Sequence, residues 1–213
     1  MSAPVLSHIP ASSSSGMASV WRPADKSGDA HRHGLALFAM TDARRAHRTL
    51  LLLRHAKSGY PDGVADHDRP LAARGVREGA LAGDWIRAHV PPVDAVLCST
   101  AVRTRQTLER TGIDAPVRYL ERLYDATPGL ALAEINASPT HFGDDPATLL
   151  VVGHEPVMSS LALALAVDGI ESEVGAQVAD RFPTSSVAVL RIETSWAGLE
   201  LGSAQLVAFH TAR

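Results

Sequence analysis

The sequence predicts an α/β fold built on a largely parallel sheet, and two observations lead to this prediction. Continuous apolar runs of strand length occupy residues 49–53, 93–98 and 148–152, as expected of strands that are buried on both faces. Segments in which apolar residues recur at helical spacing separate these runs along the chain. Strands that alternate with helices are typical of α/β domains, whose strands run mostly in parallel.

The longest predicted helix follows the first strand, at residues 76–90. Its apolar residues recur at helical spacing, and the expected core-facing side includes Val76 and Leu81. Two consecutive prolines then stop this helix, because proline lacks a backbone N–H and fixes its own φ angle. A second helix is predicted at residues 102–111, with Gly112 as its C-terminal cap.

The later elements are shorter and follow the same two patterns. Pro156 is suited to the first turn of a helix, where no backbone N–H is needed. The remaining predicted strands are residues 117–120, 187–192 and 205–209, and the remaining predicted helices are residues 130–136 and 157–167.

Composition limits the classes of protein that the chain can represent. The 213 residues include 20 Lys and Arg against 23 Asp and Glu, a net charge of −3, so no basic field favours nucleic acid. A single cysteine, Cys98, excludes an internal disulfide and is expected to be an inert buried thiol. No apolar run is long enough to span a membrane. We therefore expect a cytoplasmic protein, a monomer or a weak dimer, with no nucleic-acid or membrane partner.

The first part of the chain differs in composition from the rest. Residues 12–16 are four serines and a glycine, and no sustained periodicity appears before residue 47. We expect a flexible N-terminal arm at residues 1–46 and a single domain at residues 47–213. Met40 is a possible alternative start that would remove almost all of this arm.

Polar residues that could bind a ligand or take part in catalysis follow three of the predicted strands. Arg54 and His55 come after the first strand, Ser99 and then Arg103 after the second, and His154 after the strand at 148–152. Because ligands bind outside the carboxyl ends of strands in open α/β sheets, these side chains should converge. Guanidinium groups match phosphate oxygens, and a neutral imidazole is a nitrogen nucleophile. The pattern predicts phosphoryl transfer through a phosphohistidine.

Four motifs, in order along the chain, resemble those of the histidine phosphatase superfamily, which includes the phosphoglycerate mutases. The first is Leu-Leu-Leu-Arg-His-Ala-Lys-Ser at residues 51–58, and its Arg-His-Ala-Lys-Ser form is similar to the short bacterial phosphohistidine phosphatases of the SixA type. Ala56 stands where most of the superfamily has glycine. The others are Asp-Arg-Pro-Leu at 68–71 with Arg-Gly at 74–75, the segment 99–107, and Val-Val-Gly-His at 151–154.

The resemblance implies both a fold and a mechanism. The fold would have three layers, with a mostly parallel central sheet flanked by helices, as in phosphoglycerate mutase. The activity would be a metal-independent phosphatase without a cofactor, in which His55 becomes phosphorylated. Arg54, Arg103 and His154 would hold the phosphoryl oxygens, with His154 acting better as a cation.

Two further cations could bind substrate. Lys57 follows the predicted nucleophile closely, and Arg69 lies beside a proline in the loop that follows. For both residues, a role in binding the substrate and a surface salt bridge are equally plausible interpretations.

The proton donor for the leaving group stays open at this stage. Larger relatives use a carboxylic acid, and Glu121, Asp125, Asp66 and Asp68 are all candidates here. An alkoxide leaves poorly without such a donor, whereas an imidazole depends on one less. We therefore expect protein phosphohistidine as the substrate. The alternatives are a small-molecule phosphomonoesterase of the same superfamily and an inactive phosphate-binding scaffold.

Other classes of site have weaker support. Residues 66–68, Asp-His-Asp, could suggest a metal site, but adjacent loop residues rarely face one ion, so no metal is expected. The chain has no Gly-x-Ser-x-Gly motif of a serine hydrolase and no Gly-x-x-x-x-Gly-Lys loop of an NTPase.

Overall fold

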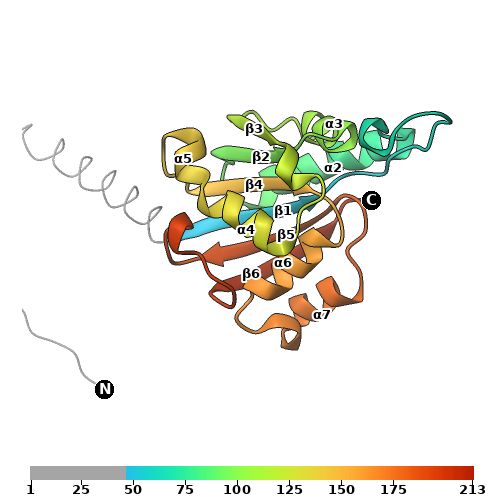
Figure 1. The fold of residues 1–213 in the computed structure, drawn as a ribbon. Helices are drawn as coiled ribbons and strands as arrows, with labels where there is room; N and C mark the ends of the chain where they lie inside the picture. The colour runs from blue at the N-terminus through green and yellow to red at the C-terminus, as the bar shows by residue number, and fades with distance from the viewer. Residues whose placement is uncertain (1–46) are drawn as a thin grey trace, which may run out of the picture. The chain divides into compact units, whose positions relative to one another are not determined.

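A six-stranded sheet forms the centre of residues 47–213, the part of the chain that the computed structural model describes (Figure 1). The predicted arm at residues 1–46, with Met40, lies outside the described residues. The strands, in chain order, are β1 (Arg48–Arg54), β2 (Ala95–Ser99), β3 (Val117–Leu120), β4 (Thr148–Gly153), β5 (Ser186–Ile192) and β6 (Ala204–Thr211). They are arranged side by side in the order β3-β2-β4-β1-β5-β6.

Strand direction divides this sheet into two parts. Strands β3, β2, β4 and β1 are parallel, whereas β5 is antiparallel to β1 and β6 is antiparallel to β5. The prediction of a mostly parallel sheet is confirmed. In the central pair, Arg54 of β1 lies opposite Gly153 of β4. His55 and His154 therefore follow their strands side by side, at the carboxyl end of the parallel strands.

Helices cover both faces of the sheet, and their bounds are α2 (Ala73–His89), α3 (Val102–Thr111), α4 (Pro128–Asn136), α5 (Ser138–Phe142), α6 (Val157–Leu165) and α7 (Glu173–Asp180). Short 3-10 turns occur between them, among them η1 (Asp66–Asp68) and η2 (Glu121–Leu123). Helices α2 and α3 lie on one face, and α4, α6 and α7 lie on the other (Figure 1). The three-layer prediction is thus confirmed, while α5 and α7 were not predicted.

Alternating side chains of the buried strands fill two separate cores. In β1, Leu50 and Leu52 pack with α4 and α6, whereas Leu51 and Leu53 pack with α2 and α3. All four side chains are fully buried, so the continuous apolar run has the physical cause that the sequence suggested. Burial on both faces also makes β1 a rigid support for the residues that follow it.

Helix α2 packs through Ile86, as predicted, and also through glycines. Val76 and Leu81 are exposed, so the predicted core-facing side of this helix is wrong for these two residues. A Cβ atom on Gly75 would lie 2.1 Å from the Lys57 carbonyl oxygen, and one on Gly83 would lie 2.0 Å from that of Thr111. The backbone of α2 therefore approaches its neighbours too closely for larger side chains, which apolar spacing alone cannot reveal.

Candidate active site

His55 directly follows β1 and is buried at the carboxyl end of the sheet. Its Nδ1 lies 2.8 Å from the Ala56 carbonyl oxygen. A carbonyl oxygen only accepts hydrogen bonds, so Nδ1 carries the hydrogen and Nε2 keeps its lone pair. The Ala56 N–H donates to Thr107 Oγ1 over 2.9 Å, which connects this loop to α3. The ring is held in the tautomer that a nitrogen nucleophile needs.

The surroundings of His55 also keep its ring neutral. Burial lowers the pKa of His55 to about 4; the hydrogen bond to Ala56 opposes this shift, and the charges of Arg103, Arg54 and Arg69 add to it. A ring with this pKa is unprotonated throughout the neutral range. Such a ring can act as a nitrogen nucleophile without a separate base to deprotonate it.

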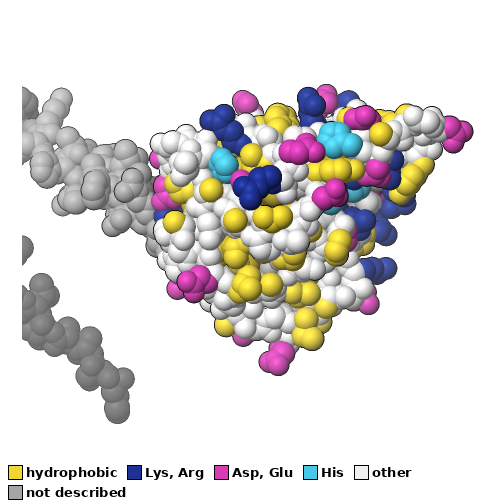
Figure 2. Space-filling model, viewed as in Figure 1, with side chains coloured by type: hydrophobic (Ala, Val, Ile, Leu, Met, Phe, Trp, Pro, Cys, Tyr) yellow, Lys and Arg dark blue, Asp and Glu magenta, His cyan; other side chains and the backbone are white. Residues whose placement is uncertain are grey.

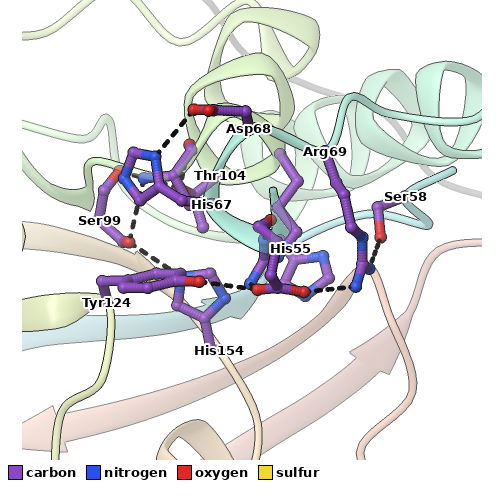
Figure 3. A network of polar contacts seen from close by, with 12 residues as sticks. His55, Ser58, His67, Asp68, Arg69, Ser99, Thr104, Tyr124 and His154 are labelled. Carbon is purple, nitrogen blue, oxygen red and sulfur yellow. Dashed lines mark hydrogen bonds and ion pairs between the residues drawn. The ribbon is translucent and has the colours of Figure 1, made fainter. Parts of the chain in front are cut away.

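His154 lies beside His55, with 5.2 Å between the two ring centroids. Its Nε2 lies 2.9 Å from Ser99 Oγ, and the Ala101 N–H also donates to this oxygen, over 3.4 Å. When the Ser99 hydroxyl donates to Nε2, the ring hydrogen of His154 lies on Nδ1. Nδ1 is buried and has no partner among residues 47–213, and in Figure 3 it faces His55.

The surroundings of His154 favour the neutral form of its ring. Burial lowers the pKa of His154 to about 3, and the neighbouring His55 and Arg103 lower it further. Two nearby groups that repel positive charge, together with lost hydration, outweigh the attraction of Asp66. His154 can still donate one hydrogen bond from Nδ1 as a neutral ring.

Arg54 and Arg103 approach the histidines from two different elements. Arg54 ends β1 and donates from Nη1 to the Phe182 carbonyl over 2.6 Å. Arg103 lies in the first turn of α3, is 7% exposed, and donates from Nη1 to the Asp66 carbonyl over 2.6 Å. The Nε atom of each arginine is buried without a partner within the described part of the chain. Unpaired buried donors are rare in proteins, so these two point to an anion that the site is built to hold.

Asp66, in η1, brings a carboxylate into contact with Arg103, Arg69 and Tyr124. Its Oδ2 accepts from Arg103 Nη2 over 3.0 Å and from the Tyr124 hydroxyl over 2.8 Å. Its Oδ1 accepts from Arg69 Nη1 over 2.5 Å. The hydrogen bond from Tyr124 and the two arginines hold the pKa of Asp66 below its usual value, while the same contact raises the pKa of Tyr124.

The other candidate proton donors lie around His67 or on the surface. His67 Nδ1 lies 3.1 Å from Asp68 Oδ1, and its Nε2 lies 3.1 Å from Thr100 Oγ1. The Thr100 hydroxyl donates to Glu121 Oε2. Asp125 is exposed. Of the four candidates from the sequence, Asp66 is the one in contact with Arg103.

The acidic side chains at residues 66–68 diverge rather than converge. Asp66 turns toward the arginines, whereas Asp68 bonds to His67. Within residues 47–213, no three His, Cys, Asp or Glu side chains are grouped so as to hold a metal ion. Cys98 is fully buried and far from reactive, because burial raises the pKa of its thiol to about 12.

Lys57 and Arg69 follow His55 in the chain and make their contacts within the loop around residues 58–69. Arg69 uses all three nitrogens within its own loop, with Nε on the Gly59 carbonyl and Nη2 on Ser58 Oγ in addition to Nη1 on Asp66. Lys57 Nζ lies 5.4 Å from the centre of the Tyr60 ring. Figure 2 shows basic, acidic and histidine side chains side by side near the loop that follows β1.

Two residues that support the site carry no recognisable signal in the sequence. Tyr124 lies edge-on to His154, with 5.6 Å between ring centroids, and contacts Asp66 as described. Ser185 has a φ angle of 64°, and its N–H points at the carbonyls of Arg54 and His55, at 3.3 and 3.2 Å. Both depend on contacts between distant segments, which residue spacing cannot indicate.

Comparison with known proteins agrees with this geometry. Residues 50–138 match the family model of the histidine phosphatase superfamily, branch 1. An uncharacterized protein of Mycobacterium tuberculosis is 59% identical over 162 residues, which span 76% of this chain and 100% of the relative. The phosphohistidine phosphatase SixA of Escherichia coli is 27% identical over 155 residues, covering 70% of this chain and 88% of SixA.

A solved structure extends the match to three dimensions. A protein of Nakamurella multipartitia, provisionally named phosphohistidine phosphatase SixA, is 41% identical and superposes with a TM-score of 0.71, covering 78% of this chain and 96% of that one. The chain therefore belongs to the histidine phosphatase superfamily. Within that superfamily it is of the SixA type, and its chemistry is that of a phosphatase. No helix in residues 47–213 is long and apolar enough to cross a membrane.

Proposed function

We propose that the protein removes phosphate from phosphohistidine on a partner protein, by way of a phosphohistidine on its own His55. The observation that supports this proposal most strongly is the orientation and neutral state of the His55 ring. Nδ1 is bound to the Ala56 carbonyl, Nε2 is free, and the pKa is about 4. A neutral imidazole whose Nε2 keeps its lone pair is ready to attack phosphorus.

The reaction then has two displacements at phosphorus. In the first, Nε2 of His55 forms an N–P bond while the bond from phosphorus to the leaving imidazole breaks, and the electron pair goes to the leaving nitrogen. In the second, water attacks the phosphohistidine, the N–P bond breaks toward Nε2, and phosphate leaves with the oxygen of water. The two steps together restore His55 and consume one water.

Arg54, Arg103 and His154 are the groups suited to the equatorial oxygens. Each offers a buried N–H without a protein partner in the described chain: Nε of the two arginines and Nδ1 of the histidine. Negative charge spreads over these oxygens in the transition state, so donors fixed in a buried site lower the barrier. The two guanidinium groups supply the positive charge.

The carboxylates near His55 are poor proton donors, which favours a leaving group that needs no proton from the enzyme. Asp66, which contacts Arg103, has a lowered pKa and is ionised at neutral pH, so it is a poor acid. Glu121 accepts a hydrogen bond from the Thr100 hydroxyl, and Asp68 lies in hydrogen-bond contact with His67. An alkoxide requires a proton as it departs, whereas an imidazole leaves more readily. The name of the E. coli relative supports the same substrate class.

Release of inorganic phosphate tests the substrate class. The protein is incubated separately with a protein carrying phosphohistidine, with a phosphoserine peptide and with a sugar phosphate. We expect rapid release from phosphohistidine and release at least about a hundredfold slower from the two alkyl esters, given that an acid catalyst contributes about 10²–10⁴-fold. Efficient turnover of the sugar phosphate with no release from phosphohistidine would instead identify a small-molecule phosphomonoesterase.

A further inference from the structure

The donors that surround the Asp66 carboxylate resemble those of an anion-binding site. Its two oxygens accept three hydrogen bonds, from Arg103, Arg69 and Tyr124, over 3.0, 2.5 and 2.8 Å. Arginine forks and a hydroxyl are also the donors that bind phosphate oxygens. One of these donors, Arg103, is a residue that the proposed function assigns to the phosphoryl group.

Phosphate and the Asp66 carboxylate cannot both be held here without cost. Both are anions, and each gains its binding energy from the same guanidinium group. Two like charges a few ångströms apart repel each other, most strongly in a partly buried site. A phosphoryl group that binds at the unpaired Nε of Arg103 therefore repels the carboxylate held on Nη2 and weakens the contact between Asp66 and Arg103.

The structure allows the Asp66 side chain to move without unfolding the loop. Its side chain is 54% exposed, and η1 contains no buried residue. The backbone carbonyl of Asp66 separately accepts from Arg103 Nη1 over 2.6 Å, so the loop stays attached when the carboxylate leaves. Arg69 and Tyr124 also contact this carboxylate, and they can continue to hold it after the bond to Arg103 breaks.

We propose that Asp66 is an internal competitor of the phosphoryl group: its carboxylate leaves Arg103 when substrate binds and returns to expel inorganic phosphate. This inference rests on the proposed function, because it assumes that Arg103 holds the phosphoryl group. The competition acts equally on bound substrate and bound product. A substrate on a partner protein gains further contacts outside the pocket, whereas free phosphate does not. The same penalty therefore leaves the substrate bound through its other contacts, while free phosphate dissociates faster.

The test compares Asp66→Asn with the wild-type protein. Asparagine keeps the shape and an oxygen acceptor for Tyr124 but removes the negative charge. The affinity for inorganic phosphate is measured by calorimetry and as product inhibition of p-nitrophenyl phosphate hydrolysis. Hydrogen bonds to charged groups contribute about 1.5–3 kcal/mol, so we expect phosphate to bind about tenfold more tightly or better. Asp66→Ser is measured in parallel and should show the same direction, whether or not the asparagine variant folds.

Asp68→Asn is the matched control. It removes the same charge two residues away, from a carboxylate that contacts His67 and not an arginine. Phosphate affinity should change less than about twofold in this variant, because exposed charges that are not in contact are screened. An equal gain in Asp68→Asn would mean that general charge, and not direct competition, sets the affinity, and would overturn the inference.

Other outcomes separate this inference from the proposed function. Weaker phosphate binding in Asp66→Asn would make Asp66 a positioning residue for Arg103. A fall in kcat at unchanged phosphate affinity would make it an acid or base. Either result refutes internal competition and leaves the proposed function standing. If the wild-type protein and Arg103→Ala bind phosphate equally poorly, the proposed function itself fails.

Discussion

Two buried clusters of charged and imidazole side chains lie at different places in the fold, and they differ in how completely they are paired. Glu134 in α4 is 6% exposed; its carboxylate oxygens lie 3.1 Å from Arg122 Nη1 and 2.9 Å from His141 Nε2. In the His55 pocket, by contrast, Arg103 and His154 each keep a buried nitrogen without a partner in residues 47–213.

This difference separates a structural cluster from a functional one. A carboxylate between two donors has its charge compensated and gains nothing from a ligand, so the Glu134 cluster connects η2, α4 and α5. Unpaired donors cost stability in the absence of a ligand, and proteins keep them where a ligand supplies the missing partner. The two clusters should therefore respond oppositely to substitution, one in stability and the other in activity.

The largest effect should come from replacing the nucleophile. His55→Ala removes the only group assigned to form the N–P bond, so we expect a fall in kcat of about 10³-fold or more with p-nitrophenyl phosphate. The circular dichroism spectrum and the melting temperature should stay close to those of the wild type. Turnover within tenfold of the wild type would disprove the assignment of His55.

The second comparison sets Arg103→Ala against Arg122→Ala, one arginine from each cluster. Losing Arg103 should weaken binding of vanadate or phosphate by about 10–100-fold, since a charge-assisted hydrogen bond contributes about 1.5–3 kcal/mol. Arg122→Ala, measured by the same calorimetric titration, should leave this affinity unchanged. Similar losses in both variants would show that only overall positive charge matters.

Glu134→Ala should produce the reverse pattern. Removing the buried carboxylate leaves His141 and the 66% exposed Arg122 without their shared partner, and a hydrogen bond to a charged group contributes about 1.5–3 kcal/mol. The free energy of unfolding in urea measures this loss, and kcat per folded molecule should stay the same. A large fall in kcat at full stability would place Glu134 in the active site and remove the contrast between the clusters.

A further prediction concerns acid and follows from the lowered histidine pKa values. His55 and His154 have pKa values of about 4 and about 3 in the folded protein, against 6.5 for an ordinary histidine. Below about pH 6.5 the unfolded chain binds more protons than the folded protein, so the free energy of unfolding falls as the pH drops toward about 4. His154→Gln should reduce this slope, which urea titrations at several pH values measure. An unchanged slope would mean that His154 is not held neutral by the fold.

Local sequence patterns were sufficient for the elements that form the core. The leucines at 50–53 predict β1, and Gly112, with a φ angle of 63°, ends α3 where expected. Strand order and the antiparallel β5 and β6 depend on contacts between distant segments and could not be predicted from spacing. Helix α7 has only two buried residues, Gly175 and Val178, and therefore lacks a clear apolar repeat.

The sequence could predict that His55 and His154 lie at the carboxyl ends of strands, but not the charge states of their rings. His55 and His154 follow β1 and β4, and their proximity comes from the parallel pairing of these two strands. The neutral state of His154 comes from burial beside His55 and Arg103, which only the folded structure shows. The contact between Asp66 and Arg103 joins a loop to a helix start, and no pattern in either segment indicates it.

Trapping of the covalent intermediate tests the central claim most directly. The protein is mixed with a radiolabelled phosphohistidine protein, quenched in alkali within milliseconds to seconds, and digested for peptide mapping. The account predicts acid-labile, alkali-stable label on the peptide that contains His55, and none in His55→Ala. Full phosphate release with no labelled His55 at any time, or with label on another residue, would contradict it.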